Sequence, residues 1–301
     1  LAAAALSPLT ARQLVDNSAG AAASQVSRLL DAGAGTVIVP TVPNVGATPA
    51  LLQAILQTLG PAAQPASAAL FQSLSTRTTP DRAAREQAIE TALGEAAGQL
   101  SAIPPIREAL AQQLIAAWRL LSEAASALTD RYNQAEEEGL LAARGNIARV
   151  DINGLFNEVI DNPFRYGLTN TAGMACPPGV SSMDCTTSTP GFSSSQQYLF
   201  ADRLHPSPAV HALIADYIQS VLNAPLQVAA LSRAPSMLVG DAQNTLDGHL
   251  QQQRQQPAEA GTLTVFGGYA GQQRDFRGDS LLDGDATSAT GTVGVGYQLT
   301  D

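Results

Sequence analysis

The hydrophobic pattern near the start of the chain predicts a helix followed by a buried strand. Within residues 20–32, Val26, Leu29 and Leu30 share one face of a helix. The run Val37–Val39 is continuous and β-branched, which is typical of a strand covered on both faces in a parallel sheet. A proline-rich loop, residues 40–49, follows this strand. In open α/β sheets, functional sites form at this carboxyl end of the strands.

Residues 50–145 have a mostly helical pattern and lie between two strand-like segments. Thr79–Asp81 has the composition of a helix start, with its proline early in the helix, and Pro104–Pro105 interrupts the pattern before a long amphipathic helix. We expect this helical insertion to be a pair of packing helices, and a lid over a site is the alternative. The run Glu136–Glu138 is expected to be a solvated charge cluster.

The middle of the chain predicts a second strand and a long loop. Ile147–Ile152 reads as a buried strand with a helix after it. Residues 168–197 are rich in Gly, Ser, Thr and Pro, and a loop of this length inside a compact domain is usually functional or held by a disulfide. The short apolar run Tyr198–Phe200 and a helix beginning at Pro208 follow. These segments together indicate an α/β fold with a parallel sheet.

The pattern changes after Pro225. Residues 226–256 are polar and rich in glutamine, as in a solvated helix or linker. Residues 262–269 and 292–299 then alternate between two faces. One face carries Leu263, Val265, Tyr269, Val293, Val295, Tyr297 and Leu299, and the other carries Thr262, Thr264, Phe266, Thr292, Gly294, Gly296 and Gln298. An apolar face opposite a small or polar one is typical of transmembrane β-barrel strands, and an ordinary hairpin is the alternative.

Charge and hydropathy restrict the partners. The chain has 301 residues, and its 16 basic and 26 acidic residues give a net charge of −10, which argues against nucleic acid as a partner. The longest apolar runs are shorter than the 18 or more residues expected of a transmembrane helix. The chain starts at Leu1 without a signal-peptide pattern and ends in a strand-like segment, so we expect it to be cut at both ends.

Cys176 and Cys185 are the two cysteines, and they enclose a short loop of Pro, Gly and Ser. Such a pair is typical of a disulfide formed in an oxidising compartment. A metal site is the alternative, but no histidine or further cysteine lies nearby in the sequence to complete four ligands.

The strongest candidate for chemistry is the segment Asp202–Pro206. Two residues on a tight turn separate Asp202 from His205, so the carboxylate can approach the imidazole. In such a pair the carboxylate fixes the tautomer of the histidine, which then acts as a general base. A helix cap beside a surface histidine would give the same spacing. His211 falls about 120° further round the following helix and is expected to be a surface residue.

The segment "YLFADRLHPSPAVHALIADYIQSVL" resembles the C-terminal catalytic block of GDSL-type (SGNH) esterases and lipases. "VIVPTVPNVGATP", "RVDINGLFNEVIDNPFRYGLTN" and the cysteine loop resemble the autotransporter branch of that family. The resemblance covers roughly residues 10–50 and 140–301. It implies a flavodoxin-like SGNH-hydrolase domain in residues 1–225, a helical linker in 226–260 and the first strands of an outer-membrane β-barrel in 261–301.

The resemblance also implies an activity and a location. It implies hydrolysis of small-molecule or lipid esters without a cofactor, by a passenger domain at the surface of a Gram-negative-type outer membrane. Asp202 would orient His205, and the nucleophilic serine and the Gly and Asn oxyanion donors would lie upstream of Leu1. A binding passenger without catalysis and a soluble periplasmic esterase with a small β appendage are the alternatives.

Gly278–Leu281 spells GDSL, but Ser280 is not expected to be the nucleophile. It follows His205 in the chain, whereas the family places the serine first. It also lacks a preceding apolar strand, because the polar segment "GQQRDFR" stands there. A permuted enzyme that uses Ser280 is the remaining alternative. We therefore expect residues 1–301 alone to be inactive as an esterase.

Overall fold

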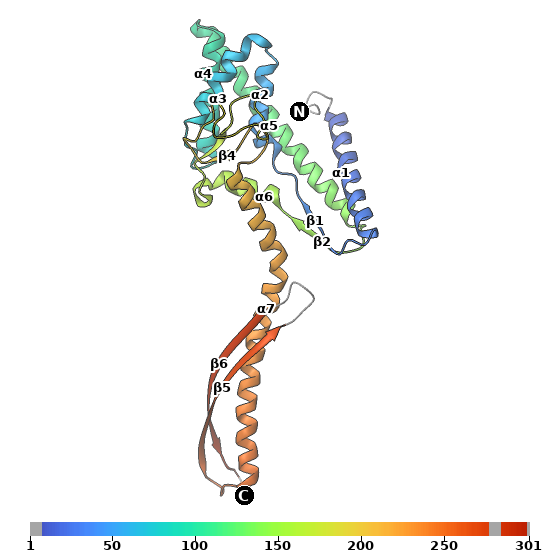
Figure 1. Cartoon of the computed structure of the whole chain (residues 1–301), viewed down its shortest axis with the longest axis vertical. Coiled ribbons are helices and arrows are strands. Elements are labelled where there is room, and N and C mark those ends of the chain that lie inside the picture. The colour runs from blue at the N-terminus through green and yellow to red at the C-terminus, as the bar shows by residue number, and fades with distance from the viewer. Residues whose placement is uncertain (1–7, 277–283, 300–301) are drawn as a thin grey trace. The chain divides into compact units, whose positions relative to one another are not determined.

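The computed structural model describes residues 8–276 and 284–299, and the chain divides into two compact units (Figure 1). The first unit is Leu1–Ile218 and the second is Gln219–Asp301. One long helix, α7 (Pro208–Gln255), runs from the first unit into the second and contains Pro225 and Pro235. None of the helices among the described residues combines the length and the hydrophobicity that crossing a lipid bilayer requires.

The first unit is α/β and contains two small parallel sheets. In chain order its elements are α1 (Pro8–Asp31), β1 (Val37–Pro40), η2 (Val45–Ala47), α2 (Pro49–Gln57), η3 (Pro61–Ala63), α3 (Gln64–Ser75), α4 (Arg82–Leu100), α5 (Pro104–Leu140), β2 (Ile147–Val150), α6 (Ile152–Asp161), η4 (Pro163–Tyr166), β3 (Asn170–Met174), β4 (Tyr198–Phe200) and the start of α7. β1 pairs with β2 and β3 pairs with β4, both in parallel. The α/β class is confirmed, but the described strands of this unit form two sheets of two strands each.

The β1–β2 sheet is covered less than the sequence indicates. Val39 is buried with Ala23 and Leu30 of α1 and Leu140 of α5, whereas Ile38 is 43% exposed. The expectation that this strand is covered on both faces is therefore wrong. The second strand also ends two residues earlier than expected, at Val150. Asp151 cannot extend it, because its carboxylate caps α6 by accepting the Gly154 N–H.

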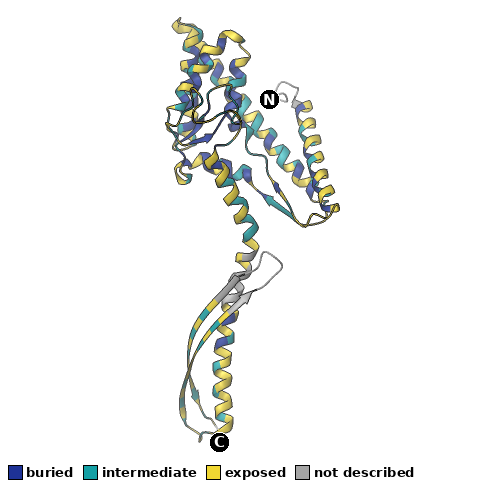
Figure 2. Ribbon diagram, in the orientation of Figure 1, coloured by how far each residue is buried: buried dark blue, intermediate teal, exposed yellow. Residues whose placement is uncertain are grey.

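The helical stretch between β1 and β2 contains four α-helices, not the expected pair. Most buried residues of α4 are alanine, leucine or isoleucine, and this helix lies against α3 and α5; Figure 2 marks the buried positions in dark blue. The prediction that Pro80 lies early in α4 is wrong. Asp81 is the N-cap of this helix and accepts the Ala84 N–H, so Pro80 precedes the helix. Pro104 is the first residue of α5 and begins that helix, as proline at a first helical position commonly does.

Glu136 on α5 is not the solvated residue that the charge run predicts. It is buried, and its carboxylate forms an ion pair of 2.6 Å with Arg149 of β2. Glu137 lies within 3.0 Å of the same guanidinium. The cluster therefore joins α5 to the β1–β2 sheet.

The loop predicted at residues 168–197 contains strand β3, whose five residues are all buried. The first residue of β3 is the buried Asn170, where a strand of a packed sheet usually has an apolar side chain. Its Nδ2 donates to the carbonyl oxygens of Leu74 and Arg77, and its Oδ1 accepts the N–H groups of Ala172 and Gly173. Gly173 lets the chain pass close to α3, since a Cβ there would lie 3.0 Å from the Leu74 carbonyl oxygen.

The second unit contains an antiparallel hairpin of β5 (Leu263–Phe276) and β6 (Gly284–Tyr297). Its apolar face is exposed, as the alternating colours along the strands show (Figure 2). This face carries the seven residues that the alternation predicts, Leu263, Val265, Tyr269, Val293, Val295, Tyr297 and Leu299. The described residues form this hairpin and no closed barrel.

The other face of the hairpin contacts α7. The His249 ring stacks on Phe266 at 3.9 Å, and the buried Asp241 carboxylate accepts a hydrogen bond from Gln272. Gly296 leaves room for the helix, since a Cβ there would lie 3.1 Å from the His249 ring. The small residues of this face therefore allow close approach of the helix.

Replacement of Asn170 by Asp is expected to lower the free energy of unfolding by about 3 kcal/mol, because a carboxylate would face two carbonyl oxygens in a buried site. Urea unfolding followed by the fluorescence of Trp118, the single and buried tryptophan, measures this. Asn17→Asp is the matched control, because Asn17 is exposed on α1. Equal effects of the two substitutions would contradict this role of Asn170.

Candidate active site

The two loops that follow the parallel strands β3 and β4 form the candidate site. The loop after β3 contains Cys176 and Cys185, and the loop after β4 contains Asp202 and His205. The Cys176 N–H donates to the Ala201 carbonyl oxygen at 2.7 Å, so the loops begin side by side. Carboxyl ends of parallel strands are where α/β proteins assemble their sites.

Backbone hydrogen bonds close the loop after β4 into a tight turn. The Ala201 N–H donates to the His205 carbonyl oxygen at 2.9 Å, and Phe200 forms an isolated bridge with Pro206. The Ala50 N–H at the start of α2 donates to the Arg203 carbonyl oxygen at 2.9 Å, which fixes the middle of the turn. The turn therefore brings the two residues chosen from the sequence together.

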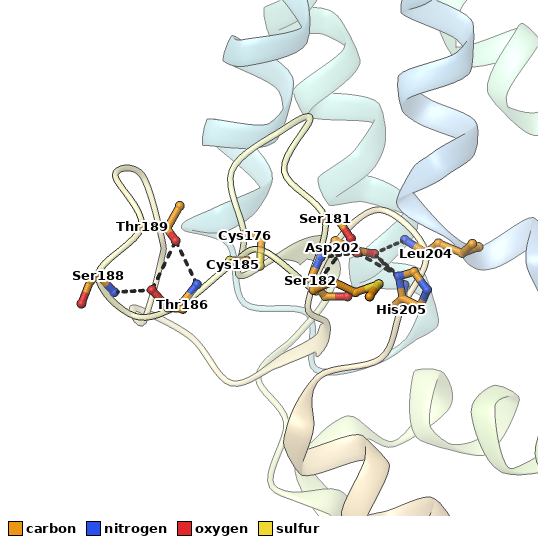
Figure 3. The surroundings of a disulfide bond; sticks show 11 residues. Cys176, Ser181, Ser182, Cys185, Thr186, Ser188, Thr189, Asp202, Leu204 and His205 are labelled. Carbon is orange, nitrogen blue, oxygen red and sulfur yellow. Dashed lines mark hydrogen bonds and ion pairs between the residues drawn. A yellow bond between two sulfur atoms is a disulfide. The ribbon is translucent and has the colours of Figure 1, made fainter.

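The carboxylate of Asp202 contacts the imidazole of His205 through Nδ1 (Figure 3). This nitrogen lies 2.9 Å from Oδ2 and 3.1 Å from Oδ1 of Asp202. With the Nδ1 proton donated to the carboxylate, neutral His205 has Nε2 as its free base. Asp202 is buried, whereas the His205 side chain is 53% exposed. The histidine can therefore meet a substrate while its partner stays out of water.

Three backbone N–H groups bind the Asp202 carboxylate in addition to His205. Oδ1 accepts the N–H groups of Leu204 and His205 at 2.8 and 2.7 Å, and Oδ2 accepts that of Ser182 at 2.7 Å. Burial by itself would raise the pKa of this carboxyl group, but the backbone donors and the His205 ring outweigh it. The pKa of Asp202 is therefore well below its usual range, and the carboxylate is ionised at neutral pH.

The disulfide between Cys176 and Cys185 holds the donor loop. It closes the segment that carries Ser182, and this segment passes beside the Asp202–His205 pair (Figure 3). The structure therefore contains the disulfide that the sequence predicts. Among the described residues, no group of three His, Cys, Asp or Glu side chains is placed to hold a metal ion.

A cavity of about 150 Å³ opens beside the pair. It is lined by Met174, Gly179, Val180, Ser181, Asp202, Arg203, Leu204 and His205. Within the part of the chain that the structure describes, the hydrogen bonds of the His205 ring go to Asp202 alone, so no serine hydroxyl contacts Nε2. Ser280 lies outside the described residues. His211 is exposed on α7, as expected.

Comparison with known proteins gives matches to a lipase and to esterases. The chain is 41% identical over 295 residues to "Lipase 1" of Photorhabdus luminescens, in an alignment that covers 98% of this chain and 43% of that protein. It is 28% identical over 180 residues to "Esterase EstA" of Pseudomonas aeruginosa and of Pseudomonas putida, which covers 58% of this chain and 28% of each relative. This chain is homologous to a lipase and to esterases.

The expected relationship to esterases and lipases is confirmed at this level. No family model matches the chain. The chain spans less than half the length of each of these relatives.

The sequence does not reveal Ser182 as part of the site. Its contribution is a backbone N–H, which every residue except proline carries, so no residue type marks it. The only available signal is the pair of cysteines, because it predicts that this loop is closed.

Replacement of Asp202 by Asn tests the lowered pKa through stability. Because the folded pKa is lowered, the ionised carboxylate stabilises the fold above the ordinary carboxyl pKa of about 3.9, and this is lost as the pH falls toward the folded value. The stability deficit of Asp202→Asn should therefore be largest near pH 5 and shrink toward pH 3. Urea unfolding followed by Trp118 fluorescence at each pH measures it.

The control for this experiment is Asp216→Asn, which changes an exposed carboxylate on α7. We expect it to show a much smaller dependence on pH. A deficit of Asp202→Asn that stays constant from pH 5 to pH 3 would contradict the lowered pKa.

Proposed function

We propose that the complete protein is a serine carboxylic ester hydrolase of the GDSL type, in which Asp202 and His205 are two members of the catalytic triad. The observation that carries this proposal is the buried, ionised Asp202 bound to Nδ1 of a half-exposed His205. Homology to a lipase and to esterases supports ester hydrolysis as the reaction. The relatives are much longer than this chain, which supports a nucleophile supplied by a part of the protein outside these 301 residues.

The proposed route is an acyl-enzyme mechanism. Nε2 of His205 takes the proton from the serine hydroxyl as the serine attacks the ester carbonyl carbon, and Asp202 stabilises the imidazolium. Hydrogen-bond donors outside this chain stabilise the tetrahedral oxyanion. His205 then gives its proton to the leaving alcohol, and water attacks the acyl-enzyme by the reverse sequence. The route uses no cofactor, and on this proposal residues 1–301 alone are inactive.

The second part of the proposal is that the hairpin belongs to an outer-membrane β-barrel that displays the esterase at the cell surface. The exposed apolar face of β5 and β6 supports it, because barrel strands present such a face to lipid. The opposite face carries glycine and threonine and contacts α7, a surface that lipid would not favour. The net charge of −10 argues against nucleic acid as a partner.

Replacement of His205 by Gln in the complete protein is expected to lower kcat on p-nitrophenyl butyrate by on the order of 10³-fold or more, because the general base is lost. The control is His211→Gln, which changes an exposed histidine six residues further along and should leave kcat unchanged. Steady-state kinetics measure both. The assignment of His205 as the base fails if the two variants are equally active.

Replacement of Val295 by Arg tests the lipid-facing surface. A charge at this exposed apolar position should destabilise a membrane-inserted barrel, by about 2–4 kcal/mol at the bilayer midplane and by less toward the interfaces. The amount of folded protein in isolated outer membranes, measured by heat-dependent gel mobility, should fall for Val295→Arg and stay unchanged for Val295→Leu. Equal amounts for the two variants would mean that this face does not contact lipid.

A further inference from the structure

A second cavity of about 430 Å³ lies between α2, α3 and the disulfide loop. Its lining comes from Gln53, Leu56, Gln57, Gly60, Ala63, Gln64, Ser67, Ala68, Pro178 and Gly179. The volume is within the range of about 300–1,000 Å³ that is usual for small-molecule sites. Gly179 also lines the cavity of His205, so the disulfide loop forms a wall of both. The Ala50–Arg203 hydrogen bond joins α2 to the catalytic turn one helical turn before Gln53.

The lining of this cavity is uncharged and mixed, with more apolar than polar surface. Three glutamines and Ser67 supply amide and hydroxyl groups, while leucine, alanine and proline supply the apolar surface. A purely hydrocarbon chain would leave these polar groups without partners, and a charged group would find no counter-ion in the lining. The chemistry that fits is an uncharged group with several hydroxyls on a short carbon skeleton.

One lining residue of this cavity, Gln53, has a buried side-chain oxygen, Oε1, without a hydrogen-bond partner in the described part of the chain. A buried polar atom without a partner costs free energy, and a ligand can supply the missing bond once the amide turns a polar atom toward the cavity. Because no protein partner fixes the amide, rotation about its last torsion can turn either the oxygen or the nitrogen toward the cavity.

We propose that this cavity binds the hydroxyl-bearing alcohol part of the ester substrate, such as a glycerol or sugar group, and that Gln53 is the residue that selects it. This inference rests on the proposed function. In the acyl-enzyme route His205 protonates the leaving alcohol, so the alcohol must lie beside His205. Gly179 lines both this cavity and the His205 cavity, so the proposal places the rest of that alcohol on the other side of Gly179.

The test compares two esters of the same acid in the complete protein. Glyceryl monobutyrate carries the hydroxyls and ethyl butyrate does not. Gln53→Met keeps a side chain of similar length and removes the amide, so the ratio of kcat/KM for the glyceryl ester to that for the ethyl ester should fall about five- to tenfold. Gln72→Met, on the exposed side of α3, is the matched control and should leave the ratio unchanged.

Other outcomes would overturn the inference. If Gln53→Met leaves the ratio of the two kcat/KM values unchanged, or lowers kcat/KM equally for both esters, Gln53 does not distinguish the alcohols. A change that instead grows with acyl-chain length, whatever the alcohol, means that the cavity holds the acyl chain.

A binding measurement separates failure of this inference from failure of the proposed function. If the wild-type protein hydrolyses neither ester, the proposed function fails. The side-chain amide signal of Gln53 in ¹⁵N NMR, assigned by its loss in Gln53→Met, is then followed in the 301-residue chain during additions of glycerol or 1-propanol. A shift with glycerol alone supports the cavity as a polyol site, and no difference between the two probes overturns it.

Discussion

The geometry of the candidate site depends on how one buried carboxylate is stabilised. Asp202 can stay ionised away from water only because hydrogen-bond donors surround it. Two of the backbone donors come from its own turn and the third, Ser182, comes from the disulfide loop. The two loops must therefore be held together for His205 to be oriented. The pairing of β3 with β4 and the disulfide provide this, so the second loop is part of the site although it contributes no side chain to the pair.

The helices between β1 and β2 also hold this arrangement. Arg85 of α4 is buried and donates to the carbonyl oxygens of Ala47 and Thr171, which joins the helix to β3 and to the loop after β1. Burial lowers the pKa of this guanidinium to about 10, so it stays charged at neutral pH. Together with the bond from Ala50 to Arg203, this contact connects the helices to the strands and the turn that form the site. The helical segment that the resemblance does not cover, residues 51–139, therefore has a structural role.

Sequence alone predicted the parts of the structure that rest on local patterns. The spacing of Asp202 and His205 on a proline-flanked turn indicated the pair, and the alternation after residue 262 indicated the two faces of the hairpin. Strand β3 was missed because Asn170 replaces an apolar anchor with four hydrogen bonds that form only in the fold. Glu136 was misjudged for the same reason, because its partner Arg149 lies on a different element. Periodicity cannot reveal partners that are distant in the chain.

The hairpin shows how the two kinds of information combine. Its pattern defines an apolar and a small or polar face, but not which of them is covered. The structure shows α7 on the small face, where Phe266 stacks on His249 and glycine makes room, so the described residues leave the apolar face exposed. A contiguous apolar surface of this kind is unfavourable in water and requires a partner. Each strand has 14 residues, and the exposed apolar side chains lie within residues 263–269 and 293–299, so a partner would cover this part of the hairpin.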